Sequence, residues 1–202
     1  MNKRNLSIGC LTIFLILAAV GGYYGYQFAQ QVNFTGFTGS GAAVDVAVPD
    51  GFQVNIFAEG LSGPRFMAVG PEGDLYVADR GNDRIVALPD ADGDGAADTV
   101  RVVAADIPSP HSIIYHEGHW YVGVTSGVIR LTDTDGDGVA DERTTIIDDL
   151  PTSGSHSTRT VAFLPDGRMV VSIGSSCNVC EEEDERRAAV VVYDDANGTN
   201  GR

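Results

Sequence analysis

Beyond residue 48 the chain alternates short apolar stretches with turn-forming residues. Three of these stretches are rich in β-branched and aromatic residues, namely residues 75–78, 120–123 and 169–172. This composition favours strands over helices, because branched and aromatic side chains pack well on a pleated surface. A glycine-containing turn stands before each stretch, at residues 70–73, 116–118 and 164–167. Each stretch is therefore predicted to be the second strand of a β-hairpin.

The same arrangement recurs at a fixed interval along the chain. Two of the units add a further pair of predicted strands: residues 84–88 with 99–103, and residues 127–131 with 144–147. Corresponding residues of successive units, such as Asp90 and Asp133 or Ile107 and Leu150, lie 43 residues apart. Units of roughly 40 residues with four short strands each are typical of the blades of a β-propeller.

We therefore predict an all-β fold, a β-propeller of which residues 48–202 form about three blades. A propeller closes its ring with roughly four to eight blades, so on this interpretation the sequence is an N-terminal part of a longer propeller. Residues 197–202 are turn-rich, and such a segment ordinarily leads into a further strand. Because an open stack of blades leaves sheet faces exposed, we expect such a fragment to be inactive on its own.

The first residues of the chain follow a different pattern. Lys3 and Arg4 precede an apolar run over residues 8–20, which glycines and tyrosines extend to about the length that spans a bilayer. We interpret residues 1–29 as a transmembrane signal anchor. The alternative is a cleaved signal peptide, although residues 19–21 only half satisfy the small-residue requirement of a processing site.

Residues 30–47 are rich in Gly, Thr, Ser and Ala and lack helical periodicity, which is typical of a flexible linker. The predicted organisation is thus an anchor, a linker and a partial propeller over residues 48–202. On this interpretation the propeller is exported and held by the N-terminal segment at the periplasmic or extracellular face of the membrane.

The charge of the chain excludes one class of function and points to a metal. A formal net charge of -15, with only 13 Lys and Arg, argues against binding to nucleic acid. Eight of the acidic residues lie in two near-identical loops: Asp90, Asp92, Asp94 and Asp98, and Asp133, Asp135, Asp137 and Asp141. Oxygen ligands at alternating positions, with glycines that permit a sharp turn, suit calcium.

These loops differ from the EF-hand, because the twelfth positions are Arg101 and Thr144 in place of a bidentate Glu. We expect Asp98 and Asp141 to supply the closing carboxylates. The predicted role of the metal is structural, since the loops join the outer strands of two blades. The alternative is a pair of solvated hairpin turns, because Asp and Gly are also favoured in turns.

The third unit carries a more specific signature. Residues 154–167 read GSHSTRTVAFLPDG, and residues 171–182 read VSIGSSCNVCEE. These motifs resemble the glucose/sorbosone dehydrogenase family, in particular its sorbosone dehydrogenase branch, and residues 63–69 with 75–79 fit the same group. The resemblance spans residues 48–202. It implies a six-bladed propeller that binds pyrroloquinoline quinone (PQQ) above the central channel and oxidises a sugar hydroxyl or aldehyde hydrate by hydride transfer to the quinone.

By this resemblance His156 takes the place of the family's catalytic base, and a neutral imidazole can accept the proton of a hydroxyl. Ser175 stands where the glucose-oxidising branch places an Asp. A hydroxyl can orient a His but does not stabilise its cation as a carboxylate does. Arg65, His111 and Arg159 are predicted to contact the cofactor or the substrate, because the guanidinium fork of Arg matches the carboxylates of PQQ.

Cys177 and Cys180 form a CxxC motif. Attachment of haem c needs a His at the next position, which is Glu181, and a zinc site needs a second pair of ligands. An oxidising compartment favours a local disulfide between the two cysteines. A redox-active dithiol is the alternative.

The leading hypothesis is a PQQ-dependent sugar or aldose dehydrogenase, with PQQ and Ca²⁺ as cofactors and an electron acceptor of the respiratory chain as its partner. The main alternative is a non-enzymatic exported propeller that binds a carbohydrate or a protein partner, because a fold alone does not fix a function. A propeller hydrolase of the lactonase type needs calcium ligands on the inner strands, whereas the Asp-rich loops are predicted to join outer ones.

Overall fold

The computed structural model describes residues 47–202. The predicted anchor, and all but the last residue of the predicted linker, lie outside the described residues. The chain divides into two units, Met1–Val54 and Asn55–Arg202. In the described part of the first unit, the amide of Phe52 donates to the carbonyl of Pro49 at 3.1 Å. Within residues 47–202, no helix has the length and apolar character that crossing a membrane requires.

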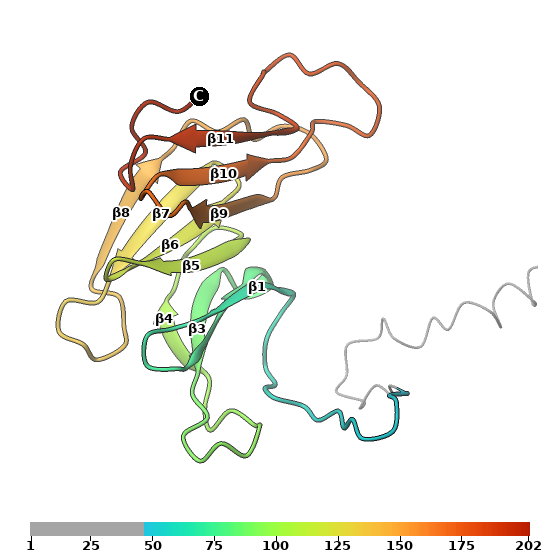
Figure 1. The fold of residues 1–202 in the computed structure, drawn as a ribbon, viewed down its shortest axis with the longest axis vertical. Helices are drawn as coiled ribbons and strands as arrows, with labels where there is room; N and C mark the ends of the chain where they lie inside the picture. Colours follow the sequence, from blue (N-terminus) through green and yellow to red (C-terminus); the bar gives the residue numbers. More distant parts are fainter. Residues whose placement is uncertain (1–46) are drawn as a thin grey trace, which may run out of the picture. The chain divides into compact units, whose positions relative to one another are not determined.

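Among the described residues, eleven strands form three antiparallel sheets in the second unit (Figure 1). The first sheet consists of β1 (Pro64–Val69), β2 (Leu75–Asp79), β3 (Arg84–Leu88) and β4 (Arg101–Ala104), in that order. The second consists of β5 (Ser112–His116), β6 (His119–Val124), β7 (Gly127–Thr132) and β8 (Glu142–Ile147). The third consists of β9 (Arg159–Phe163), β10 (Met169–Ile173) and β11 (Ala189–Tyr193). A short 3-10 helix, η2 (Arg80–Asn82), joins β2 to β3.

The all-β prediction is confirmed, and every strand predicted from an apolar stretch overlaps an observed strand. The hairpin turns need the glycines that predicted them, since Gly73 and Gly167 have φ of 99° and 86°, where a side chain is strained. The third sheet differs from the prediction because it contains β11, which the repeat analysis missed. Beyond β11, the backbones of Val192 and Arg202 exchange two hydrogen bonds of 2.9 and 3.0 Å, so the last residues continue this sheet.

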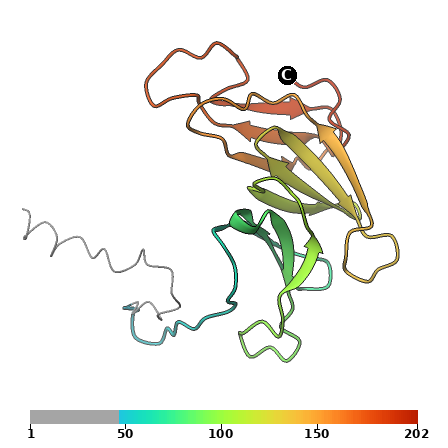
Figure 2. The same ribbon diagram turned by 180° about the vertical axis from the view of Figure 1, so that it is seen from behind.

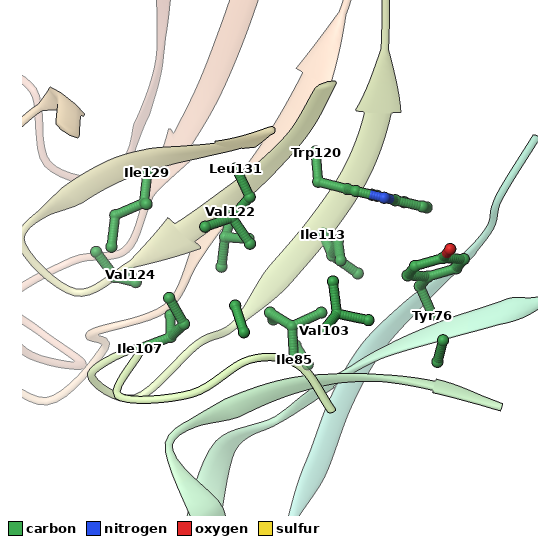
Figure 3. Close-up of a cluster of buried hydrophobic side chains, with 13 residues drawn as sticks. Tyr76, Ile85, Val103, Ile107, Ile113, Trp120, Val122, Val124, Ile129 and Leu131 are labelled. Carbon is green, nitrogen blue, oxygen red and sulfur yellow. The ribbon is translucent and has the colours of Figure 1, made fainter. Parts of the chain in front are cut away.

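Two apolar cores hold the three sheets together. The first lies between the first and second sheets and contains Tyr76, Ile85 and Val103 on one side and Trp120 and Val122 on the other (Figure 3). The rings of Tyr76 and Trp120 are 4.0 Å apart between centroids. Burial of such large apolar side chains is the main favourable term in folding.

The second core lies between the second and third sheets. Tyr121 and Val128 from the second sheet pack with Met169, Val171 and Ile173 from β10. Alternate residues of β10 are buried, because successive side chains of a strand point to opposite faces. Figure 2 shows the same sheets from behind, with the loops after β3 and β7 projecting beyond the strands.

The first strands of the three sheets, β1, β5 and β9, lie side by side. The amide of Phe66, near the start of β1, donates to the carbonyl of His111, just before β5, at 3.2 Å. The amide of Val161 in β9 donates to Oγ of Ser112, the first residue of β5, at 3.1 Å. The beginnings of these three strands are therefore neighbours, although they are far apart in the sequence.

We predict that Val122→Ala lowers the free energy of unfolding by about 2–3 kcal/mol, because it removes two methyl groups and leaves a cavity between the first two sheets. Val122 is fully buried, with 0% of its surface exposed. Val179→Ala is the matched control, since Val179 is 95% exposed. Urea denaturation of both variants measures the difference, and an equal effect of the two substitutions would contradict the assignment of this core.

Candidate functional site

The three residues predicted to contact a cofactor all lie at the neighbouring beginnings of the first strands. Arg65 is the second residue of β1 and is exposed, His111 directly precedes β5, and Arg159 is the first residue of β9. The positive charges of Arg65 and Arg159 both act on the imidazole of His111. The structure therefore brings these predicted residues together, as the equivalent position of the three strands in the repeat requires.

His111 is buried, with 2% of its surface exposed. Within the described part of the chain, neither ring nitrogen has a hydrogen-bond partner. Burial, together with the charges of Arg80, Arg65 and Arg159, lowers the pKa of His111 to about 4. The imidazole is thus neutral at physiological pH, and a buried polar group without a partner is costly.

Arg159 has no exposed surface. Its Nη1 donates to the carbonyl of Thr158 at 2.8 Å, and its Nη2 donates to the carbonyl of Pro151. Burial lowers the pKa of Arg159, and the nearby charge of Arg187 adds to that effect. The terminal nitrogens therefore brace the segment that carries His156. Contact between Arg159 and a cofactor stays a prediction.

Arg187 supports the same segment from the loop that precedes β11. It is 6% exposed, its Nη2 donates to the carbonyl and hydroxyl of Ser153, and its Nη1 donates to the carbonyl of Gly174 at 3.4 Å. Two buried guanidinium groups thus hold the 151–158 segment through its main-chain oxygens. Arg187 could not be predicted from the sequence, because one arginine after an acidic run carries no signal of burial.

Arg80 was also missed, although it belongs to the same cluster. Burial alone would raise the pKa of the Asp79 carboxyl, but donors on Asn82, Arg84 and Ser62 outweigh that effect and lower it. These donors lie 2.6 to 2.8 Å from the Asp79 carboxylate, which has no exposed surface. Asp79 thereby fixes the turn of η2 that presents Arg80. An acidic residue at the end of a buried strand, followed by Arg, was the signal available in the sequence.

The arginines of this cluster form no ion pair within the described part of the chain. The ion pairs formed there involve other residues, and none includes Arg65, Arg80, Arg159 or Arg187. Three arginines, Arg65, Arg80 and Arg159, thus act on His111, and Arg187 lies next to Arg159, in a chain whose net charge is -15. An anion bound at this place would be stabilised by them.

His156 is exposed and lies in the segment that the two buried arginines brace. Its Nδ1 is 2.9 Å from the hydroxyl oxygen of Ser175 and 3.1 Å from the carbonyl oxygen of the same residue. Ser175 therefore contacts the imidazole of His156, as its place in the motif suggested. Among the hydrogen bonds of residues 47–202, those of the ring involve Nδ1 and not Nε2.

Cys177 and Cys180 form a disulfide in the loop that follows Ser175. The preceding residue, Ser176, donates its amide to a carboxylate oxygen of Glu182 at 2.7 Å, and its carbonyl accepts the amide of Ser155 at 2.8 Å. The disulfide loop is thus tied to the residue before His156. A local disulfide at this place limits the conformations that the loop can adopt.

The two Asp-rich loops lie between β3 and β4 and between β7 and β8. Asp90 and Asp133 each accept hydrogen bonds from glycine amides of their own loops, at 2.7 to 3.1 Å. Carboxylate oxygens come within 4.8 Å of one another in two groups: Asp90, Asp92 and Asp94, and Asp133, Asp135 and Asp141.

The two loops differ in their closing carboxylate. Asp141 belongs to the second group, whereas Asp98 lies outside the first and accepts the amide of Ala91 at 2.8 Å. Asp137 likewise accepts the amide of Val139 at 2.8 Å. Arg101 from β4 donates to the carbonyl of Asp137 at 3.1 Å and so braces the second loop from the neighbouring sheet.

Three antiparallel sheets, joined in series with their first strands side by side, define an all-β fold of the propeller type. The chain belongs to a protein family described as a domain of unknown function (DUF7133), whose model matches residues 40–194. No curated protein matches the chain.

Solved structures with the same fold include sugar dehydrogenases. The PQQ domain of pyranose dehydrogenase from Coprinopsis cinerea is 24% identical, with a TM-score of 0.64 over 73% of this chain and 37% of that one. A carbohydrate-active enzyme of family AA12 from Trichoderma reesei is 23% identical, with a TM-score of 0.63 over 73% and 40%. The PQQ-bound aldose sugar dehydrogenase from Streptomyces coelicolor is 17% identical, with a TM-score of 0.56 over 72% and 48%.

The chain thus covers less than half of each of these structures. At such identities the similarity establishes the fold, which is that of PQQ-dependent sugar dehydrogenase domains. The narrower sorbosone dehydrogenase branch stays a prediction.

We predict that the depressed pKa of His111 makes the protein less stable in acid. The unfolded imidazole titrates near 6.5 and the folded one near 4. The unfolded state therefore binds more protons between these values, and stability falls by up to about 3 kcal/mol as the pH decreases from 6.5 to 4. In His111→Phe this part of the pH dependence should disappear.

Denaturant unfolding between pH 4 and 7 measures the effect. His119→Phe is the control, because His119 lies outside the cluster and contacts Thr132; it should keep the wild-type slope. If the free energy of unfolding of His111→Phe depended on pH as steeply as that of the wild type, the imidazole of His111 would have the same pKa in the folded and unfolded states.

Proposed function

We propose that this protein is a PQQ-dependent dehydrogenase that oxidises a sugar or aldose, with His156 as the catalytic base. The observation that carries the proposal is the cluster of Arg65, Arg80 and Arg159 around the buried His111, at the beginnings of the first strands. His156 lies three residues before β9, and its carbonyl accepts a hydrogen bond from Nη1 of Arg159 at 3.5 Å. The positive charge at this place opposes the negative charge of the whole chain, as a site for an anionic cofactor requires.

The residues present fit PQQ, which carries several carboxylates and a quinone. Arg65 and Arg80 are exposed and free to form bidentate contacts with carboxylates. The two nitrogens of His111 and the Nε of Arg159 lack partners among the described residues but are buried, so these groups would act on the cofactor through charge and dipole from beneath the exposed arginines. When bound, PQQ supplies a quinone that accepts a hydride from the substrate carbon.

His156 handles the proton of the same oxidation. As the hydroxyl group of the substrate becomes a carbonyl, its oxygen loses a proton and its carbon loses a hydride. The exposed imidazole takes the proton and later returns it to solvent. The buried arginines keep the His156 segment in place, and such positioning is worth a large part of a reaction barrier.

The narrower features of the proposal rest on the motifs around His156 and Ser175. A sorbosone-like or glucose-like sugar is the expected substrate, since the similar structures include a pyranose dehydrogenase and an aldose sugar dehydrogenase. Further blades, to a total of six, would complete the propeller. Exposed apolar side chains on β1, such as Met67 and Val69 at 57% and 66%, support packing of another blade against the first sheet.

The proposed setting is the outer face of a membrane. The N-terminal segment would anchor the protein there, and an electron acceptor of the respiratory chain would reoxidise the quinone. The disulfide between Cys177 and Cys180 supports an exported location, because disulfides persist in oxidising compartments.

We further propose that the Asp-rich loops bind structural calcium. The clustered carboxylates of each loop offer the oxygen ligands that this cation prefers. One of the similar structures is a calcium structure of the Trichoderma reesei enzyme of family AA12. The loops connect outer strands, away from His156, so bound calcium would stabilise the sheets and take no part in proton transfer.

We predict that His156→Ala lowers PQQ-dependent turnover by about 10²- to 10⁴-fold, the usual contribution of a general base. The full-length gene product, reconstituted with PQQ and calcium, is assayed with an artificial electron acceptor against a panel of aldoses and polyols. Binding of PQQ, followed by its absorbance, should be unchanged.

His119→Ala is the matched control and should turn over as the wild type does. A folded protein that binds no PQQ would overturn the proposal and leave the alternative of an exported propeller that binds a carbohydrate or protein partner.

We predict that calcium raises the melting temperature of the protein and that Asp90→Asn with Asp133→Asn abolishes the increase. A bound ligand at a concentration 100 times its Kd stabilises a protein by about 2.7 kcal/mol. Thermal unfolding with calcium and with a chelator measures the effect. Asp148→Asn, at an exposed position outside both loops, is the control. Equal melting temperatures of the wild type in calcium and chelator would exclude the metal.

A further inference from the structure

The imidazole of His156 has two oxygen neighbours on one residue. Its Nδ1 lies 3.1 Å from the carbonyl oxygen of Ser175 and 2.9 Å from the hydroxyl Oγ. The same carbonyl also accepts the backbone N–H of His156 at 3.3 Å. Ser175 therefore contacts both the main chain and the ring of His156.

The chemistry of these oxygens decides which ring nitrogen carries the proton. A carbonyl oxygen only accepts hydrogen bonds, whereas a hydroxyl group accepts or donates. If Nδ1 were unprotonated, its lone pair would face the carbonyl oxygen at 3.1 Å, which is repulsive. If Nδ1 carries the proton, it donates to both oxygens and every contact is favourable. The two lone pairs of the carbonyl accept the backbone N–H and the ring N–H together.

We infer that the main-chain carbonyl of Ser175 fixes His156 in the Nδ1–H tautomer and leaves Nε2 as its basic nitrogen. The inference rests on the proposed function in naming Nε2 as the atom that takes the hydroxyl proton of the substrate. Ser175 is thus a positioning residue, and its main-chain carbonyl is the group that orients the imidazole of His156. The hydrogen bond at one ring nitrogen sets the role of the other.

Gly174 makes this close contact possible. A Cβ at Gly174 would collide with the carbonyl oxygen of His156 and lie 2.6 Å from its Cβ, well inside the usual separation of carbon atoms. Its φ is outside the left-handed region, so the glycine is needed here for space. In Gly174→Ala, the two segments must separate, and the contact between Ser175 and the imidazole is lost.

The surrounding loop holds the carbonyl in place. Ser176 accepts the amide of Ser155 at 2.8 Å and donates its own amide to Glu182 at 2.7 Å. The disulfide between Cys177 and Cys180 closes the loop immediately afterwards. The carbonyl of Ser175 is thus presented by a constrained main chain, and it remains whichever side chain occupies position 175.

The test is nitrogen NMR of the full-length protein labelled with ¹⁵N-histidine, in which long-range couplings distinguish protonated from unprotonated ring nitrogens. Within residues 1–202 there are four histidines, and His156→Gln assigns the signal. We expect the Nδ1–H tautomer in the wild type and in Ser175→Ala, which keeps the carbonyl. Gly174→Ala should show a mixture of tautomers. Gly167→Ala is its control, since it strains a hairpin turn where an added Cβ meets nothing within 4 Å.

An Nε2–H tautomer in the wild type would overturn the inference. A change of tautomer in Ser175→Ala would also overturn it, because the hydroxyl would then be the group that matters. Both outcomes are measured without a catalytic assay, and neither requires Gly174→Ala to fold. They therefore test this inference separately from the proposed function. If PQQ-dependent turnover is present, Gly174→Ala should lower kcat on the order of 10²-fold with little change in KM.

Discussion

The packing of consecutive sheets against one another is the constraint on which the rest of the structure depends. Each sheet buries one face against the next, through Tyr76 and Trp120 in the first core and Tyr121 and Met169 in the second. Because the chain enters each sheet through its first strand, this packing sets β1, β5 and β9 side by side. The residues that begin these strands then meet, although no local interaction links them in sequence. The arginines therefore cluster because they occupy similar positions in successive repeats and because the two cores pack the sheets of these repeats against one another.

The position of each guanidinium group determines its part in the site. Arg159 and Arg187 are buried. Their guanidinium N–H groups donate hydrogen bonds to the carbonyl groups of Pro151, Ser153, Thr158 and Gly174. They hold the His156 segment and add positive charge without facing solvent. Arg65 and Arg80 are exposed and form no ion pair within residues 47–202. Burying charged groups without a carboxylate partner is costly. The buried arginines therefore lower the stability of the fold, and the proposed anionic cofactor would restore it.

Much of the fold could be predicted because it depends on local patterns. Apolar stretches and glycine turns located the strands of the hairpins, and β3 has the predicted bounds. The strand β11 was missed, since residues 181–187 before it are charged and the spacing of the repeat breaks there. Of the site, the motif identified His156 and Ser175. Arg187 and Arg80 escaped prediction because their roles depend on burial and on neighbours from other sheets. Asp98 lies outside the first carboxylate group and Asp141 lies within the second, although both accept the amide seven residues before them; the identical spacing of the two loops does not reveal this difference.

The absence of a carboxylate at position 175 agrees with the electrostatics of its surroundings. Gly174, next to Ser175, accepts a hydrogen bond from Arg187, so a carboxylate at 175 would stand close to that guanidinium and compete with the imidazole for it. It would also cancel part of the positive charge that the arginine cluster offers to an anion. A neutral carbonyl and a hydroxyl orient the ring without adding negative charge. The imidazole keeps a defined tautomer, and the arginines keep their charge for a ligand. Ser175 therefore suits the proposed site, in which a base and a bound anion would share the same few residues.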